Sequence, residues 1–194
     1  MKKSIVLLSV AMLTMFLFGT ASAFEFSADM IMSASGQVMK GKIFMKDKKI
    51  RMENQGQPGY NIVRSDKNLM WMVMPSSKSY MEMKSDPSNK PRTEEKVPGE
   101  ISRKKIGSEK IDGHPTDKYE ITYTNKGKTD KIYQWMATDI NFPIKTAAVD
   151  GSFTQEYKDI KIGGQSDSLF EVPSGYKKMA MPSMPQMPQG VGGR

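Results

Sequence analysis

Apolar and polar residues alternate along the chain after residue 23, in short runs that turn-forming residues separate. In the run at 24–34, Met30 and Met32 alternate with Asp29 and Ser33, a period of two that is typical of a strand with one buried face. Gly, Pro, Asn and Asp residues between the runs supply turns. We therefore predict strands in this half of the chain at 24–34, 37–47, 48–54, 60–64, 69–74 and 79–84.

The run at 69–74 is apolar at every position, which is typical of a central strand covered on both faces. Residues 85–100 hold three prolines among mixed charges, and we expect a linker, a lid or a mobile loop there. Alternation then resumes and predicts strands near 101–111, 117–125, 130–138, 144–149 and 153–163. The predicted fold class is all-β, a single curved antiparallel sheet of about eleven strands, an unclosed half-barrel with little helix.

Methionine fills many of the apolar positions, and the chain has 18 methionines in 194 residues. The flexible, polarisable thioether lets a surface built from Met adapt to ligands of varied shape. A sheet without a helical cover exposes a large apolar face, and such patches usually mark binding sites. The alternative is that the same side chains fill the space between the sheet and its cover. The candidate ligand-binding residues are Phe26, Met30, Met32, Met39, Ile43, Met45, Met52, Met70, Met72, Met74, Met81 and Met83.

Short motifs in the chain resemble the LolA/LolB/LppX superfamily of periplasmic lipid and lipoprotein carriers. Residues 49–53 (KIRME) are similar to its strand of the form gk-x-R-aromatic-E, and residues 62–71 (IVRSDKNLMW) to the hairpin that follows. Residues 168–176 (SLFEVPSGY) are similar to its terminal F-x-h-P-x-G motif. Asn68 stands where the superfamily often has Gly, and Asn also tolerates a left-handed turn.

This resemblance implies a half-barrel whose concave face holds an acyl chain beneath a lid. Where those carriers have a helical lid, this chain offers only the proline-rich segment 85–100. The likeness is to exported members of the superfamily that have no assigned activity. The implied role is carriage of a lipid or another amphipathic ligand.

The first 23 residues are typical of a signal peptide. Lys2 and Lys3 precede an apolar run, and Ala21-Ser22-Ala23 forms a small-residue cleavage site. We expect export to the periplasm, a soluble mature protein with one domain at 24–178, and a disordered Met- and Pro-rich tail at 179–194. The chain has no cysteine, which excludes disulfides and the lipid-bearing cysteine of a lipoprotein.

Basic residues outnumber acidic ones, with a formal net charge of +8. This favours loose association with anionic lipid headgroups, so we expect a membrane surface or an outer-membrane component as a further partner. Many lysines alternate with apolar residues along the strands, as on the wet face of a half-exposed sheet. No basic-aromatic motif is concentrated anywhere, so we expect no nucleic-acid partner. We also expect a monomer.

No constellation for catalysis is visible in the sequence. His114 is the single histidine and lies in a Gly-His-Pro turn without a second metal or catalytic partner nearby in the sequence. Arg51 and Glu53 point together from one strand and are expected to have a structural role. Trp71 and Trp135 are expected in the core. Nothing pairs the carboxylates Glu53, Glu82, Glu120 and Glu156 as acid and base, so we expect no enzyme and no cofactor.

The tail suggests one alternative function. Met179, Met181, Met184 and Met187 have the spacing to gather thioethers around one ion, and thioethers are soft ligands that favour Cu(I). The competing explanation is a low-complexity tail in a chain that is Met-rich throughout. The leading prediction remains a periplasmic binding or carrier protein for a lipid or other amphipathic ligand, and Cu(I) binding is the alternative.

Overall fold

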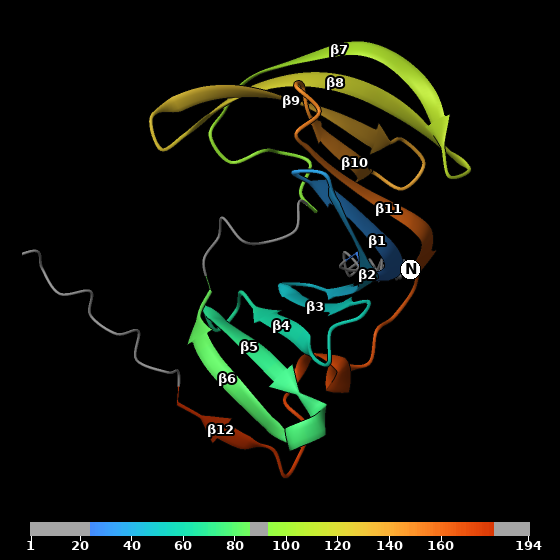
Figure 1. Cartoon of the computed structure of the whole chain (residues 1–194). Coiled ribbons are helices and arrows are strands. Elements are labelled where there is room, and N and C mark those ends of the chain that lie inside the picture. The colour runs from blue at the N-terminus through green and yellow to red at the C-terminus, as the bar shows by residue number, and fades with distance from the viewer. Residues whose placement is uncertain (1–23, 86–92, 181–194) are drawn as a thin grey trace, which may run out of the picture.

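A computed structural model describes residues 24–85 and 93–180. In these residues the chain forms one sheet of 12 strands in the order β12-β6-β5-β4-β3-β2-β1-β11-β10-β9-β8-β7, which curls without closing (Figure 1). The predicted all-β, unclosed fold is therefore confirmed. The strands are β1 (Phe26–Ala34), β2 (Gln37–Lys46), β3 (Lys49–Asn54), β4 (Tyr60–Arg64), β5 (Leu69–Met74), β6 (Ser79–Lys84), β7 (Glu100–Ile111), β8 (His114–Asn125), β9 (Lys128–Ala137), β10 (Phe142–Ala148), β11 (Phe153–Ile162) and β12 (Lys177–Met179).

The twelfth strand is the main departure from the predicted topology. β12 is three residues long and pairs with β6 in parallel, so the sheet is mixed rather than purely antiparallel. Three residues are too few to show a period of two in the sequence. The strand forms because its backbone pairs with the free edge of β6. Two short 3-10 helices, η1 (Pro75–Ser77) and η3 (Asp167–Phe170), complete the described structure.

The hairpin that carries the superfamily motif turns at Asn68. Its φ is 54°, in the left-handed region that Asn adopts more readily than most residues. The Asn68 carbonyl accepts a hydrogen bond from the Ser85 amide at 3.2 Å. The turn that the sequence predicts here is confirmed.

Residues paired across neighbouring strands point to the same side of a sheet, so the register defines one face through β1–β6. One row on it consists of Phe26, Met45, Ile50, Val63, Met70 and Met83. The next row consists of Ala28, Ile43, Met52, Asn61, Met72, Met81 and Met179. Because alternate residues share a side, all the candidate ligand-binding residues lie on this face, which we call the methionine face.

Aromatic residues form the core beside β1, on the methionine face. The ring centroids of Phe26 and Phe142 lie 4.7 Å apart, and those of Phe142 and Tyr157 5.3 Å apart. Phe26 and Tyr157 are fully buried. Their contacts join β1, β10 and β11, the centre of the sheet, into one hydrophobic cluster with Ile43 and Ile50.

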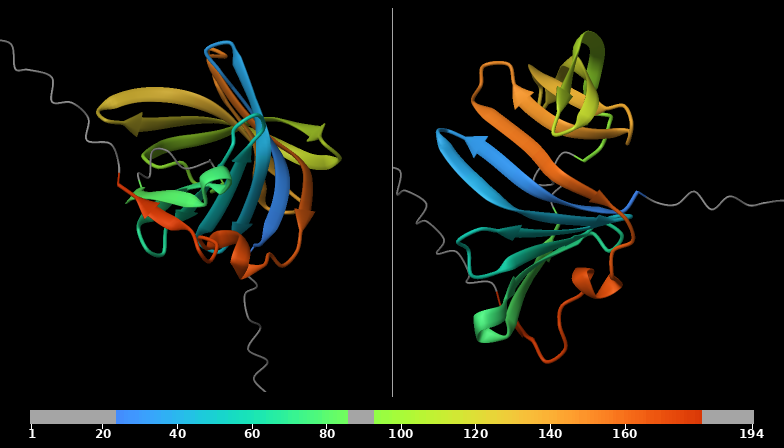
Figure 2. Two further views of the ribbon diagram at one scale, coloured as in Figure 1. Left: turned by 60° about the horizontal axis from the view of Figure 1, so that its bottom comes forward. Right: turned by 90° about the vertical axis from the view of Figure 1, so that its right-hand side faces the viewer.

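Over β3–β5, the opposite face of the sheet is covered by residues 165–176, which we call the C-terminal strap and which includes η3 (Figure 2). Phe170 is fully buried there in one cluster with Ile62, Trp71 and Val73. Burial of one phenylalanine contributes about 1.5–3 kcal/mol, so the strap is a stable part of the fold.

The prediction that the strand at 69–74 is covered on both faces is wrong at Met72. Trp71 and Val73 are buried beneath the strap, whereas Met72, on the other face, is 36% exposed. The strap covers only one side of β5. Alternation within an all-apolar strand therefore separates a core face from an open one.

The segment before β7 lies on the same side of the sheet as the methionine face. Pairing continues that side through the row Met32, Gln155, Thr146, Gln134 and Tyr119. Val97 is 3% exposed and packs against Ile121 and Ile132. These two residues lie two positions along their strands from Tyr119 and Gln134 and therefore share their side of the sheet.

Residues 93–99 are held there by hydrogen bonds. Gln134 donates from Nε2 to the Glu94 carbonyl oxygen at 3.3 Å, and Arg103 donates from Nη2 to the Glu95 carbonyl oxygen at 2.5 Å. Residues 86–92, in the middle of the predicted linker or lid, lie outside the described residues. No helix within 24–85 and 93–180 is long and apolar enough to span a membrane.

Candidate functional site

The methionine face is covered unevenly. Phe26, Met30 and Ile43 are at most 3% exposed and belong to the central hydrophobic cluster. Met32, Met45, Met52 and Met70 are partly buried against that cluster. The burial of these side chains therefore decreases along the methionine face from β1 toward β5.

The part of this face on β5 and β6 lies beyond that cluster. Met72, Met74, Met81 and Met83 belong to none of the three buried clusters that the described residues form. Met179 of β12 pairs with Met81 and is 46% exposed. We call these five side chains the methionine shelf. Met39, at the other end of the face on β2, is also exposed, at 43%.

Asn61 of β4 is the polar member of the row that leads to the shelf. It pairs with Met52 on one side and with Met72 on the other. Its side-chain oxygen Oδ1 is buried and has no hydrogen-bond partner. A buried polar atom without a partner costs about 1–3 kcal/mol, so this amide is an unusual group to find among thioethers.

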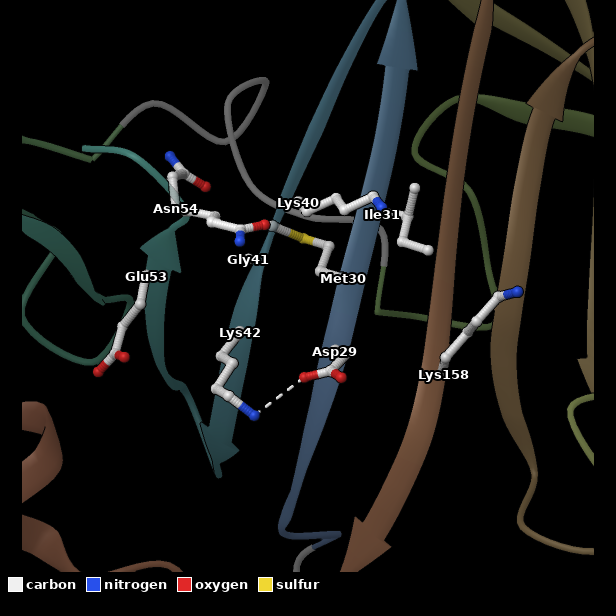
Figure 3. Close-up of a pocket in the computed structure, with 10 residues that line it drawn as sticks. Asp29, Met30, Ile31, Lys40, Gly41, Lys42, Glu53, Asn54 and Lys158 are labelled. Atoms are coloured by element: carbon white, nitrogen blue, oxygen red, sulfur yellow. Dashed lines mark hydrogen bonds and ion pairs between the residues drawn. The ribbon is translucent and has the colours of Figure 1, made fainter.

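A separate, open pocket of about 550 Å³ lies where β1, β2 and β3 meet (Figure 3). Lys42 donates from Nζ to the Asp29 carboxylate at 3.0 Å, and this hydrogen bond raises the pKa of Lys42. A Cβ at Gly41 would lie 2.2 Å from the Glu53 carbonyl oxygen, so only Gly allows this close approach of β2 and β3. The pocket is lined by Asp29, Met30, Ile31, Lys40, Gly41, Lys42, Glu53, Asn54, Gln55 and Lys158. Of the candidate ligand-binding residues, it includes only Met30.

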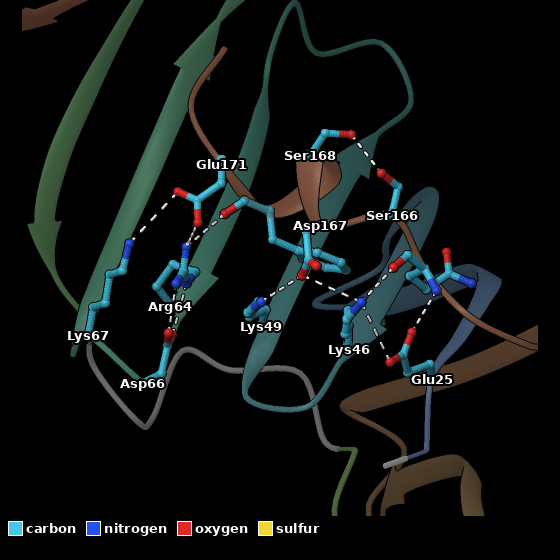
Figure 4. A network of polar contacts seen from close by, with 12 residues as sticks. Glu25, Lys46, Lys49, Arg64, Asp66, Lys67, Ser166, Asp167, Ser168 and Glu171 are labelled. Atoms are coloured by element: carbon cyan, nitrogen blue, oxygen red, sulfur yellow. Dashed lines mark hydrogen bonds and ion pairs between the residues drawn. The ribbon is translucent and has the colours of Figure 1, made fainter. Parts of the chain in front are cut away.

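Polar contacts fasten the C-terminal strap to the sheet (Figure 4). Arg64 is 4% exposed and donates from Nε and Nη2 to the two carboxylate oxygens of Asp66, at 2.9 and 2.7 Å. Its Nη1 donates to the Phe170 carbonyl oxygen at 3.2 Å and to the Glu171 carboxylate. The hydrogen bonds from Arg64 lower the pKa of Asp66 to about 2.

A second group of contacts fixes the start of the strap. Lys49 donates to Asp167 at 2.8 Å, which lowers the pKa of the Asp167 carboxyl. Lys46 donates to the backbone carbonyl oxygen of Gln165 at 3.0 Å, and the backbone N–H of Gln165 donates to the Glu25 carboxylate at 2.6 Å. These contacts have a structural role, because Lys46 and Lys49 each bind a residue of the strap.

The other residues singled out from the sequence have protein partners as well. Arg51 and Glu53 form an ion pair with each other at 2.7 Å, and the Arg51 guanidinium lies 3.6 Å from the Tyr60 ring centroid. His114 Nδ1 lies 2.8 Å from Asp139 Oδ2, a partner that sequence spacing did not indicate.

The remaining carboxylates and both tryptophans also form hydrogen bonds or ion pairs within the protein. Trp71 and Trp135 are buried as expected, and Trp71 Nε1 donates to Glu82 at 2.9 Å. Glu120 and Glu156 form ion pairs with lysines. Among residues 24–85 and 93–180, no group of three or more His, Cys, Asp or Glu is placed to hold a metal ion.

The predicted copper tail is only partly within the described residues. Met179 ends β12, whereas Met181, Met184 and Met187 lie outside the described residues, as does the predicted signal peptide. Asn61 and Arg64 were not singled out from the sequence. The signal that could have found them is a polar residue inside the otherwise apolar strand at 60–64.

Solved structures with a similar fold have low sequence identity to this chain. The MucA/MucB complex of Pseudomonas aeruginosa matches with a TM-score of 0.52 and 11% identity, over 78% of this chain and 56% of that chain. This chain therefore spans a little over half the length of that relative. At 11% identity the match shows the fold alone.

Two further structures belong to the superfamily that the sequence motifs resemble. The lipoprotein LppX of Mycobacterium tuberculosis has a TM-score of 0.42 and 12% identity, over 71% of this chain and 84% of that chain. A LolA superfamily protein of Nitrosomonas europaea has a TM-score of 0.36 and 12% identity, over 77% and 90%. At these TM-scores and identities the two matches carry no argument about the fold or the ligands of this chain.

No curated protein matches the sequence. A family model described as a domain of unknown function (DUF4412) matches residues 24–141.

Proposed function

The chain belongs to the DUF4412 family, whose description assigns no activity, and from the geometry of the methionine face we propose that it is an exported binding or carrier protein for a lipid or another amphipathic ligand. The apolar part of the ligand would lie on the methionine face, over β3–β6. The observation that carries this proposal is the uneven cover of the sheet. The strap seals one side of β4–β6, while the methionine shelf on the other side stays partly exposed.

The exposed side chains are of a kind suited to variable ligands. Met72 and Met179 are 36% and 46% exposed, and Met74, Met81 and Met83 are partly buried around them. A contiguous apolar surface on an exported domain is costly to leave in water, and such surfaces usually mark binding sites. Thioether side chains can change rotamer to follow an acyl chain without forming specific contacts.

Asn61 supports an amphipathic ligand rather than a purely apolar one. Its amide lies between Met52 and Met72 in the middle of the face, and its Oδ1 lacks a partner. A ligand hydroxyl or amide near this position would satisfy a group that otherwise costs stability. Polar groups of this kind fix the orientation of a ligand within an apolar site.

The proposal is tested on the chain produced with its own N-terminal segment and purified from the periplasm. We expect lipid to be found by native mass spectrometry and by organic extraction, and we expect a fluorescent fatty acid to bind the delipidated protein. Recovery of the protein from the cytoplasm alone would contradict the proposed location. Absence of bound lipid together with no probe binding at micromolar concentration would contradict the carrier function.

A further inference from the structure

We propose that Met72, Met81 and Met179 form a binding site for a soft monovalent cation, Cu(I), at the β12 edge of the sheet. Cation binding at this place goes beyond the carrier function and does not depend on it. The ligands come from three adjacent strands, β5, β6 and β12 (Figure 1).

The register brings the three thioethers side by side. Met72 pairs with Met81 across the antiparallel β5–β6 ladder, and Met81 pairs with Met179 across the parallel β6–β12 ladder. Side chains that pair directly across strands have Cβ atoms about 4.5–5.5 Å apart and share a face. Three rotatable bonds in each side chain let the sulfur atoms converge on one ion.

The chemistry of the donors selects the ion. Thioether sulfur is a soft, neutral ligand that favours Cu(I) over Zn(II) and harder divalent ions. On this face the three strands carry Met70, Met72 and Met74, then Ser79, Met81 and Met83, then Lys177 and Met179. Lys177 is the single charged side chain among them and is exposed, so its repulsion of a cation is reduced by solvent.

The site is also accessible. Met72 is 36% and Met179 46% exposed, so an ion can reach the sulfur atoms without opening the core. Met74 and Met83 flank the row on the same face and can supply a further sulfur. Glu82 and Lys178 point to the other face, where they bond each other at 2.6 Å, and they take no part in the site.

This site differs from the tail site that the sequence suggests. There Met179 would act together with Met181, Met184 and Met187, whereas β12 gives Met179 two partners within the folded sheet. The two sites make opposite predictions for removal of residues 181–194. A folded site survives that truncation and a tail site does not.

The experiment measures Cu(I) affinity by competition with a chromophoric Cu(I) chelator under reducing conditions, with Ag(I) as a redox-inert probe. We expect Met81→Leu to lower affinity at least about tenfold, because one of three soft ligands is lost while the face stays apolar. The control is Met39→Leu, a more exposed methionine on the same face at β2, which should leave affinity unchanged. Deletion of 181–194 should also leave it unchanged.

A second measurement uses the unaltered protein, so that it does not depend on how a variant folds. In spectra of protein labelled at the methionine ε-methyl groups, Ag(I) should shift the signals of Met72, Met81 and Met179, and Zn(II) should not. Equal losses from Met81→Leu and Met39→Leu would overturn the proposal. So would loss of binding on truncation, or shifts confined to other methionines. Cu(I) affinity and fatty-acid probe binding are measured separately on the unaltered protein, so failure of this site and failure of the carrier function are separable.

Discussion

Arg64 of β4 donates a hydrogen bond from Nη1 to the backbone carbonyl oxygen of Phe170 at 3.2 Å, and this contact ties the C-terminal strap to β4. Arg64 lies in one motif that resembles the LolA/LolB/LppX superfamily and Phe170 lies in another. The two motifs, far apart in the sequence, are thus one structural unit.

Replacing Arg64 with alanine should destabilise the fold strongly. The change leaves the Phe170 carbonyl, Asp66 and Glu171 without their donor, and breaking a buried ion pair costs about 3–5 kcal/mol. We expect about 3 kcal/mol, since Asp66 and Glu171 are partly exposed, measured by urea unfolding. Lys67→Ala is the control, because Lys67 lies 3.8 Å from Glu171 at the surface and should change stability by less than about 1 kcal/mol. Equal effects of the two changes would contradict this role for Arg64.

The same arginine makes stability depend on acid pH. It holds the pKa of Asp66 at about 2, below the ordinary value of 3.8. A carboxyl with a lowered pKa in the folded state stabilises the fold above its unfolded pKa, and this stabilisation is lost as the pH falls through the folded value. We expect the melting temperature to fall between about pH 4 and pH 2, and to fall less in Asp66→Asn. Parallel curves for the two proteins would contradict the assignment.

A charge on the methionine shelf should weaken ligand binding without unfolding the protein. Met72 is 36% exposed, so the ammonium of Met72→Lys can reach water while it interrupts the apolar surface. We expect at least about a tenfold loss of fatty-acid probe binding, with the circular dichroism spectrum unchanged. Val38→Lys is the control: Val38 is 62% exposed and alternates with Met39, so it points to the opposite face. Normal probe binding by Met72→Lys would place the ligand elsewhere.

Asn61→Leu should stabilise the protein. Removal of a buried oxygen that has no partner avoids its desolvation cost, and we expect a gain of about 1 kcal/mol in urea unfolding. Asn54→Leu on β3 should give no gain, because Asn54 donates to Gln57 at 3.2 Å. Loss of stability in Asn61→Leu would show that the amide has a partner in solution. A gain in stability with weaker lipid binding would assign Asn61 to the ligand.

Alternation alone was sufficient to predict most of the sheet. The strands at 60–64, 69–74 and 79–84 have the predicted bounds, because turn residues end each apolar run. The pattern could not show that β12 joins β6, since that pairing depends on a free edge and not on the sequence of Lys177–Met179.

The sequence also identified the candidate methionines, but it could not predict which of them are buried. Phe26 and Met72 both occupy apolar positions in alternating or all-apolar strands, yet one is fully buried and the other is 36% exposed. The difference arises from neighbours in space: Phe142 and Tyr157 cover Phe26, and the strap lies on the far side from Met72. Contacts between segments distant in the chain decide burial, and no local pattern contains them.

The position of β1 in the sheet has a consequence for how the protein folds. The first described strand lies in the centre, paired with β2 on one side and with β11 on the other, where Phe26 pairs with Ile162. Synthesis begins at the N-terminus, so the two halves of the sheet cannot join until β11 has been made. Pairings between distant residues form slowly, because they close a long loop before any contact compensates for its entropy. The pairing of β1 with β11 therefore becomes available only late in synthesis, shortly before the strap and β12 add to the other half of the sheet.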